Sequence, residues 1–437
     1  MSTNLESLFR ISWKGRIARA LLPLVTMTPQ KLAAHAKNHT AVYRRLYENH
    51  DTEDFDALPL LTKKAVRQAS PFDFLSDWYK DKVFYYGETT GSTGRPTPSF
   101  MMKREYYGIV FLAAMTPYYG ALAEQLRRNR ICVNGMSFGF TIAGESYSYM
   151  MVQSGALVAN VGSRSTLATP PRTADAVSRL KPGFIVGAPL DLLAWMRIVK
   201  EDHPETYEEV ARELSIFLSS AELCSVSRRK AIEKHFGLIQ IDTYATVEGF
   251  FTIACPCGAK HIIPMHLVEL FDEQLKKIGG LGRGRLVFSN LAKRSTPLVR
   301  YLLDDLVTIK PSDACPWGYD LEIIPHGRYE LSVRVKDELL NVGDFEEEIF
   351  QEGLFGDYRV RLLDNNESEV ILEDYAAPKG AEKRVEERLN ARFGLNCRAS
   401  LKPYGFLTPY REPRTSKAIL KVEDRRRDSR QTIPEVL

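Results

Sequence analysis

The chain has 437 residues and a formal net charge of +4, from 59 Lys and Arg against 55 Asp and Glu. This length exceeds what one hydrophobic core usually serves and predicts two or more domains, while the small charge gives no argument for binding nucleic acid. No stretch approaches the roughly 18 uninterrupted apolar residues of a membrane span, and the N-terminus lacks a secretory signal pattern. We therefore expect a cytoplasmic protein without a membrane partner, whose six cysteines are reduced.

The first eighty residues predict helices. Pro29–Lys37 and the segment after it carry helix formers at helical spacing. Thr62 follows a turn and is suited to cap the next helix, because its hydroxyl can accept from a free N–H of the first turn. A strand is expected at Val83–Tyr86.

A loop rich in glycine and hydroxyl groups follows this strand and precedes a segment that we expect to turn helical. It reads Thr89-Thr90-Gly91-Ser92-Thr93-Gly94-Arg95-Pro96-Thr97. Glycines let a backbone close round an anion, and N–H groups and hydroxyls can donate to phosphate oxygens. The pattern matches neither the Walker loop nor the dinucleotide turn. Its composition leaves two interpretations open, a phosphate-binding loop and a polar surface loop.

Short apolar runs then alternate with helical segments, which predicts a parallel sheet covered on both faces. The expected strands are Ile131–Val133, Gly155–Ala159, Phe184–Gly187 and Leu214–Leu218. Near residue 250 the pattern changes, and Gly279–Phe288 predicts turns leading into antiparallel strands. A shorter α+β segment follows, with its helices and final strand expected in Glu346–Gly353, Lys379–Phe393 and Ser416–Arg426.

The predicted fold is therefore α/β in two parts, a large N-terminal domain of sheets and helices with a small β region, and a small mobile α+β C-terminal domain. We place the first at 1–327, with a helical start at 1–80 and the functional sites within 81–327. The second covers 328–437, and the boundary lies at about Gly327–Ser332.

Cys255, Cys257 and His261 lie within seven residues, and Cys315 follows after a strand region. Three thiolates and one imidazole are a ligand set that structural Zn²⁺ prefers. The region 255–315 thus predicts a zinc site without a catalytic role, because all four positions would be filled. The alternative is a set of unrelated reduced thiols with an exposed histidine. The other cysteines, Cys132, Cys224 and Cys397, are expected to be small core residues.

Several distant segments, taken in order, resemble the adenylate-forming superfamily, specifically its phenylacetate–CoA ligase branch. The resemblance covers about 58–424, and its motif order carries more weight than any single motif. Its motifs are Thr90–Thr97, Ser220-Ala221-Glu222, Asp242-Thr243-Tyr244-Ala245-Thr246-Val247-Glu248, Leu298-Val299-Arg300-Tyr301-Leu302-Leu303-Asp304-Asp305-Leu306, Gly327-Arg328 and Pro413-Arg414-Thr415-Ser416-Lys417-Ala418. Several relatives in this branch also carry a Cys/His cluster between these motifs.

This resemblance implies that a carboxylate attacks the α-phosphate of ATP, which gives an acyl-adenylate and pyrophosphate. Thr90 to Arg95 would cradle the β- and γ-phosphates, and Lys417 would bridge the attacking carboxylate and the α-phosphate. Tyr244 would lie on the adenine, Glu248 on Mg²⁺, and Asp305 on the ribose hydroxyls. The other nucleotide-site positions implied are Thr89, Ser220, Ala221, Glu222, Asp242, Ala245, Thr246 and Arg328. Arg300 is open between a catalytic phosphate contact and a structural ion pair.

The chain departs from the family pattern at several of these positions. Val247 replaces a Ser or Thr, and Ala245 replaces a Gly, so the turn there should have an ordinary negative φ. The hinge after Gly327-Arg328 lacks its usual acidic pair, and the lysine loop lacks its usual Gly, which leaves Lys421 as a competitor for Lys417. These departures weaken the prediction of a standard two-step ligase more than they weaken the prediction of ATP binding.

The resemblance also implies where the acid binds. Phe138, Gly139, Phe140 and Gly144 would line a flat apolar slot suited to an aryl or arylacetic acid, unless these aromatics are simply core. Ser219 and Thr243 would supply polar contacts.

Three functions follow as hypotheses. The first is an aryl-acid–CoA ligase that uses ATP and Mg²⁺. The second is an adenylating enzyme that passes the acyl group to a carrier-protein thiol, an amine or another nucleophile. The third is a non-catalytic ATP-binding homologue. A homodimer is compatible with the sequence but not fixed by it.

Overall fold

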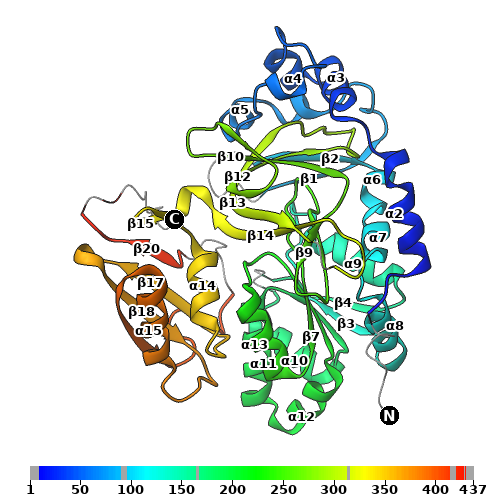
Figure 1. Ribbon diagram of the computed structural model, residues 1–437. Coiled ribbons are helices and arrows are strands. Elements are labelled where there is room, and N and C mark those ends of the chain that lie inside the picture. Colours follow the sequence, from blue (N-terminus) through cyan, green and yellow to red (C-terminus); the bar gives the residue numbers. More distant parts are fainter. Residues whose placement is uncertain are drawn as a thin grey trace. The chain divides into compact units, whose positions relative to one another are not determined.

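The computed structural model describes residues 9–89, 96–163, 167–312, 315–413, 420–427 and 429 (Figure 1). The chain forms two compact units. Unit 1 comprises the residues up to Arg130, Met136–Asn160 and Thr243–Ile324, and unit 2 comprises Ile131–Gly135, Val161–Asp242 and the residues from Pro325 on. No helix in the described part of the chain is long and apolar enough to cross a bilayer.

Unit 1 begins with helices that start directly after a hydroxyl residue. Ser12, Thr28, Thr40 and Thr62 each accept a hydrogen bond from the backbone N–H three residues later, which satisfies a donor that the helix leaves free. The predicted cap at Thr62 is thus confirmed. The elements are α2 (Trp13–Val25), α3 (Pro29–His39), α4 (Ala41–Leu46), α5 (Lys63–Gln68) and the short 3₁₀ turns η1 (Phe55–Ala57) and η2 (Pro71–Phe74).

The predicted strand at Val83–Tyr86 is β1 (Val83–Glu88), but a second strand follows it where a helix was expected. This strand, β2 (Pro98–Met102), pairs antiparallel with β1 before α6 (Lys103–Tyr107) begins. All five β2 residues are buried, and a short apolar run of this kind has no periodicity that separates strand from helix. The remaining elements of this region are α7 (Ile109–Ala114), α8 (Tyr119–Arg128), α9 (Ala143–Gln153) and β4 (Leu157–Asn160).

A large, mainly antiparallel sheet forms the centre of unit 1, with the strand order β11-β10-β12-β13-β14-β9-β8. Its strands are β8 (Thr252–Ala254), β9 (Lys260–Ile262), β10 (His266–Phe271), β11 (Lys277–Gly279), β12 (Gly282–Asn290), β13 (Tyr301–Pro311) and β14 (Leu321–Arg328). The antiparallel pairing of β12 with its neighbours confirms the prediction for Gly279–Phe288.

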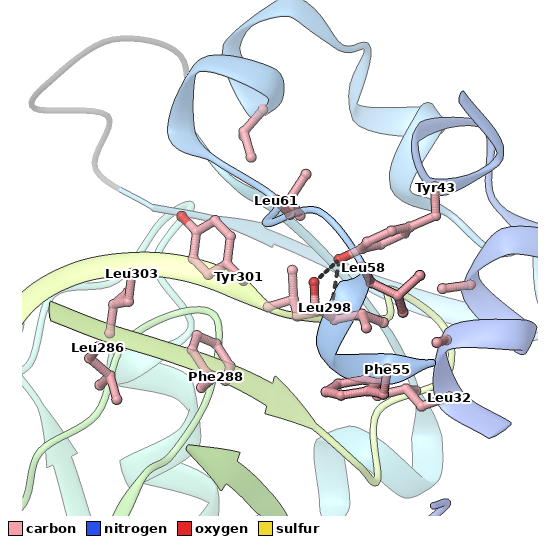
Figure 2. Packing of buried hydrophobic residues seen from close by; sticks show 14 of the residues in the cluster. Leu32, Tyr43, Phe55, Leu58, Leu61, Leu286, Phe288, Leu298, Tyr301 and Leu303 are labelled. Atoms are coloured by element: carbon pink, nitrogen blue, oxygen red, sulfur yellow. Dashed lines mark hydrogen bonds between the residues drawn. The ribbon is translucent and has the colours of Figure 1, made fainter. Parts of the chain in front are cut away.

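The N-terminal helices and this sheet share one apolar core (Figure 2). Leu32 and Phe55 from the helical region and Phe288 from β12 are fully or almost fully buried there. The Tyr43 hydroxyl, also buried, accepts from Val299 N at 2.7 Å and donates to Val299 O at 3.2 Å. This polar pair fixes the segment that leads into β13, where two candidate site residues lie.

Unit 2 contains parallel strands in the order β3-β5-β6-β7, which are β3 (Ile131–Asn134), β5 (Phe184–Gly187), β6 (Ile216–Ser219) and β7 (Ile239–Asp242). Every residue of β5 and β6 is buried, as expected for a parallel sheet with both faces covered. The accompanying helices are α10 (Pro170–Leu180), α11 (Pro189–Asp202), α12 (Pro204–Glu213) and α13 (Val226–Phe236). The strands predicted here are confirmed.

The last segment of unit 2 has its own core and its own sheet, in the order β19-β18-β17-β20. Its elements are η3 (Tyr329–Leu331), β15 (Val333–Val335), β16 (Glu338–Leu340), α14 (Val342–Phe350), β17 (Asp357–Leu362), η4 (Asp364–Asn366), β18 (Glu367–Glu373), α15 (Ala381–Phe393), β19 (Asn396–Lys402) and β20 (Val422–Asp424). The predicted fold class, α/β with a smaller α+β part at the C-terminus, is therefore confirmed. The boundary at 327/328 and the mobility of the C-terminal part stay predictions.

Candidate functional site

Two residues that lie 61 positions apart in the sequence meet in unit 1. The Tyr244 hydroxyl donates to Asp305 Oδ2 at 2.5 Å, and the Tyr244 ring stacks on Phe251 with centroids 5.4 Å apart. Tyr244 follows β7 directly, and Asp305 lies in β13, where it is buried. The structure thus brings together the side chains predicted for the adenine and the ribose.

A second chain of polar contacts links Glu248 to the end of the glycine-rich loop. The Tyr301 hydroxyl donates to Glu248 Oε1 at 3.2 Å, and it lies 3.1 Å from Thr97 Oγ1. All three side chains are buried. Sequence reasoning placed Tyr301 in a motif but missed this linking role, because nothing in the sequence indicates which hydroxyl faces the carboxylate.

The two ends of the loop are closed by mutual hydrogen bonds. Thr97 N donates to Thr89 Oγ1 at 2.9 Å, and Thr89 N donates to Thr97 O at 3.2 Å. The side chain of Thr89 therefore fastens the base of the loop in this structure. The predicted phosphate contacts Thr90, Gly91, Ser92, Thr93, Gly94 and Arg95 lie outside the described residues.

Glu248 lies in a tight turn that is closed by the backbone. Thr246 N donates to Gly249 O at 2.9 Å, and Gly249 N donates to Thr246 O at 3.2 Å. Ala245 is not among the described residues that have a positive φ, which confirms the expected ordinary backbone there. Within the described part of the chain, the buried Thr246 Oγ1 has no hydrogen-bond partner. The pattern that the sequence resembles has a hydroxyl side chain at position 247. This chain has Val247 there and carries a hydroxyl one position earlier, on Thr246.

A buried lysine near this turn was missed by sequence reasoning. Lys293 Nζ donates to Ser99 Oγ in β2, and burial lowers the pKa of Lys293 to about 8, against the opposing effect of the Glu105 and Glu248 carboxylates. A single lysine in a polar loop carries no pattern that would single it out. It adds a cation to the neighbourhood of Glu248.

Arg300 makes a buried ion pair with Glu269, which corresponds to one of the two roles that the sequence left open. Its guanidinium donates to both Glu269 carboxylate oxygens, at 3.2 and 3.0 Å. It also donates to the backbone carbonyls of Phe55, Asp56 and Leu58. Both Arg300 and Glu269 are buried, so this cation is engaged on every side of its planar group by the protein itself.

The predicted site residues of unit 2 lie at the carboxyl ends of its parallel strands, where α/β sheets commonly bind ligands. Ser219 Oγ donates to Asp242 Oδ1 at 2.6 Å. Glu222 accepts from Leu190 N at 3.3 Å and from the buried Arg228 at 3.2 Å. The carboxylates of Asp242 and Glu222 are therefore both held by hydrogen bonds. Glu222 belongs to the motif Ser220-Ala221-Glu222. Its other members are Ser220, whose N–H donates to Gly187 O, and Ala221, whose φ is 69°.

Of the residues predicted for the acid site, Phe138, Gly139, Phe140, Gly144 and Thr243 belong to unit 1, and Ser219 belongs to unit 2. Phe138 and Phe140 are 39% and 67% exposed, so neither is a core aromatic. A Cβ at Gly144 would lie 2.8 Å from the Phe138 ring, and only glycine leaves room for that ring. Gly139 has a φ of 100° between the two rings. The neighbouring Thr243 Oγ1 lies 2.7 Å from the Tyr147 hydroxyl.

Lys417 and Lys421 are the two candidates for the adenylation lysine, and the structure shows the contacts of Lys421. Lys421 Nζ makes an ion pair with the buried Asp357. Burial raises the pKa of Asp357, but the Lys421 ammonium holds it below its ordinary value. Lys417 lies outside the described residues. At the predicted hinge, the Arg328 carbonyl accepts from Asn341 Nδ2 at 2.6 Å.

The predicted metal ligands converge at one end of the β8–β9 hairpin. The candidate ligand atoms of Cys255, Cys257, His261 and Cys315 all lie within 4.8 Å of one another. Gly258, with φ 98°, lets the turn close by donating to Cys255 O at 2.9 Å. His261 Nδ1 lies 3.2 Å from Leu321 O, which orients Nε2 toward Cys257 Sγ at 3.4 Å. This set fits a tetrahedral zinc site, including the hydrogen bond that fixes the ligand tautomer.

No protein-family model and no curated protein matches the chain, but solved structures do. A 2-hydroxyisobutyryl-CoA ligase in the postadenylation state with 2-HIB-AMP has a TM-score of 0.71 at 17% identity, covering 94% of this chain and 90% of that chain. The same ligase with 2-HIB-AMP and CoA, in the thioesterification state, gives 0.55 at 19%, covering 98% and 94%. The acyl acid amido synthetase GH3.15 with 2,4-DB gives 0.59 at 11%, covering 90% of each chain. The chain thus shares its fold with this CoA ligase and this amido synthetase.

Proposed function

We propose that the protein activates a carboxylic acid with ATP and Mg²⁺, releases pyrophosphate, and transfers the acyl group from the acyl-adenylate to the thiol of CoA. The observation that carries this proposal is the convergence of motif residues in unit 1. Tyr244 contacts Asp305, and Glu248 is joined through Tyr301 to Thr97 at the end of the glycine-rich loop. Side chains of these types are suited to nucleoside, metal and phosphate recognition, which supports the proposal.

The nucleoside would be held by Tyr244 and Asp305. A carboxylate provides the acceptor pair that two vicinal ribose hydroxyls need, and the ring of Tyr244, already stacked on Phe251, offers a flat apolar face for the adenine. In this arrangement the hydroxyl of Tyr244 holds the Asp305 carboxylate in place.

The triphosphate would be held by Thr90 to Arg95 and by the hydroxyls around Glu248. Glu248 and the neighbouring Thr246 hydroxyl are oxygen groups of the kind that Mg²⁺ and its waters bind. When bound, Mg²⁺ supplies charge neutralisation to the phosphates. The chain's own residues position the reacting groups. The acid's carboxylate oxygen forms a bond to the α-phosphorus, and the bond from that phosphorus to the β-phosphate oxygen breaks.

The acid we propose is aromatic, an aryl or arylacetic acid. Phe138 and Phe140 are exposed rings on either side of Gly139, and Gly144 lets the Phe138 ring pack against its backbone. Lys417 would neutralise charge between the carboxylate and the α-phosphate. The CoA thiolate would then attack the acyl carbon and release AMP. Similarity to a CoA ligase crystallised with 2-HIB-AMP and CoA supports this acceptor.

A second candidate keeps the adenylation but passes the acyl group to an amine or to a carrier-protein thiol. Two observations favour it: the altered hinge and lysine loop in the sequence, and the similarity to an acyl acid amido synthetase. In both candidates we propose that Cys255, Cys257, His261 and Cys315 hold a structural Zn²⁺ outside the reaction.

The test is a pyrophosphate-release screen over aryl, arylacetic and short hydroxy acids with ATP and Mg²⁺, followed by mass detection of the product after adding CoA or an amine. We expect pyrophosphate with an aromatic acid and a CoA thioester afterwards. Glu248→Gln and Asp305→Asn should each lower the rate by about 10²–10³-fold. Pyrophosphate followed by an amide, without a thioester, selects the second candidate. If no acid releases pyrophosphate although ATP binds, the protein is a non-catalytic homologue.

A further inference from the structure

Helix α2 presents a continuous apolar ridge on its outer face. Trp13, Ile17 and Leu24 are 66%, 50% and 76% exposed, and Leu21 and Val25 continue the ridge. Residues spaced by three or four lie on the same side of a helix, so these side chains form one surface along the whole of α2. A soluble surface rarely leaves such a row of large apolar groups uncovered.

The inner face of α2 is fixed to the body of unit 1, so the ridge cannot turn inward. A Cβ at Gly15 would lie 2.0 Å from Ala114 O, and only glycine permits this approach to α7. Leu22 is buried against Met115 and Tyr319. Arg19 donates to Trp317 O at 2.7 Å, and its guanidinium lies 4.6 Å from the centre of the Tyr319 ring. Figure 1 shows α2 beside α7.

The charged residues of α2 and its flanking positions are all basic. Between positions 9 and 27 the chain has no Asp or Glu, and it has Arg10, Lys14, Arg16 and Arg19. Lys14 and Arg16 are both exposed. At 100° per residue Lys14 lies within the arc of the ridge, between Leu21 and Val25, and Arg16 lies beyond its Trp13 edge. A symmetric pairing of two α2 helices would bring these cations together without an acidic partner in the helix. A surface that is both apolar and anionic complements the ridge better.

We propose that α2 binds the surface of a lipid bilayer that contains anionic headgroups. The ridge would enter the boundary between headgroups and acyl chains, with Lys14 and Arg16 at the level of the phosphates, as basic amphipathic helices with an aromatic residue do. A helix of 13 residues is about 20 Å long and too short to span the hydrocarbon core. The expectation of no membrane partner rested on the absence of a span, and a helix that lies in the surface needs none. This proposal does not depend on the adenylation chemistry.

The test is co-sedimentation of the full-length protein with vesicles of phosphatidylcholine and phosphatidylglycerol (7:3), compared with phosphatidylcholine alone. We expect binding to the mixed vesicles at least about tenfold tighter, and weaker binding at 0.5 M salt. Ile17→Glu with Leu21→Glu should reduce binding more than tenfold to either vesicle. Lys14→Glu with Arg16→Glu should reduce it about tenfold to the mixed vesicles only. The control for the ridge is Leu281→Glu, because Leu281 is 50% exposed outside α2, and the control for charge is Lys379→Glu with Lys383→Glu, both exposed.

Circular dichroism of each variant separates a lost surface from a lost fold. The proposal is overturned if the wild-type protein does not sediment with the mixed vesicles, or if the ridge variant binds them as well as the Leu281→Glu control. It is also overturned if light scattering shows that the ridge variant turns a dimer into a monomer while the wild-type binds no vesicles, because α2 would then be an interface between two copies. Pyrophosphate release is measured separately and reports only on the proposed function.

Discussion

Arg300 illustrates at the scale of one residue how burial decides between two roles. Its guanidinium contacts Glu269 and three backbone carbonyls. Arg300→Met would leave the Glu269 carboxylate buried, and among the described residues Lys277 Nζ, at 3.1 Å, would remain as its ion-pair partner. We expect a loss of about 3 kcal/mol in the free energy of unfolding, measured by urea denaturation. Arg212→Met, at an exposed pair with Glu213, should cost less than about 1 kcal/mol. Unchanged stability with lost pyrophosphate release would restore the phosphate-contact role.

His266 predicts a pH dependence of stability. It is buried beside Phe251 and Phe288, and burial lowers its pKa from 6.5 to about 4, although the carbonyl of Phe250 opposes this. Because the unfolded chain binds the proton more readily, stability falls as the pH drops from 6.5 towards 4, by up to roughly 3 kcal/mol. Urea unfolding at intervals across that range measures the slope. His266→Gln should flatten it. An equal slope in that variant would assign the acid sensitivity to another group.

At the scale of elements, periodicity and composition predicted the helices and strands whose formation depends on local sequence. The buried run Phe184–Gly187 matched β5 residue for residue, whereas Pro98–Met102 was missed as a strand because its partner, β1, lies across a loop. In the site, the motif order indicated Tyr244, Glu248 and Asp305. The contact of Tyr244 with Asp305, and that of Glu248 with Thr97 through Tyr301, join segments far apart in the chain, which no local pattern encodes. Arg300 was recognised as a motif residue, but only its partners in space revealed its role.

The proposed zinc ligands lie on the β8–β9 hairpin and in the segment before β14. We therefore expect removal of the metal to change the stability of this region. β9 pairs with β14 through His261 and Glu322. Zn²⁺ at the four ligands would cross-link the β8–β9 hairpin to the segment before β14, and structural zinc contributes directly to folding free energy. Cys255→Ser should abolish stoichiometric zinc, measured by mass spectrometry of the metal, and lower the free energy of unfolding by at least about 3 kcal/mol. Cys397→Ser, at a buried thiol outside the cluster, should retain zinc. Protein that is prepared without added zinc and contains none would contradict the site.

At the scale of the whole molecule, the proposed reaction has two steps, adenylation and transfer, and it needs a lysine near the substrate in the first step but not in the second. In the proposed reaction Lys417 is needed while the adenylate forms and must withdraw before CoA reaches the acyl carbon. We propose that this exchange occurs by movement of the C-terminal part about the predicted hinge at Gly327–Ser332. Lys421 is poorly suited to such a role, because its ammonium is committed to Asp357, whose other oxygen accepts from Thr408.

The two lysines should therefore fail in different ways when replaced by alanine. Lys417→Ala should lower acid-dependent pyrophosphate release by about 10²–10³-fold, leave unfolding by urea unchanged, and spare thioester formation from a supplied acyl-adenylate. Lys421→Ala should leave Asp357 buried without its cation and lower the free energy of unfolding by roughly 3 kcal/mol, with both half-reactions reduced together. Lys383→Ala, on the exposed side of α15, serves as the control for the loss of a lysine. If Lys421→Ala instead keeps its stability and loses only adenylation, the catalytic lysine is Lys421 and its pair with Asp357 must open during the reaction.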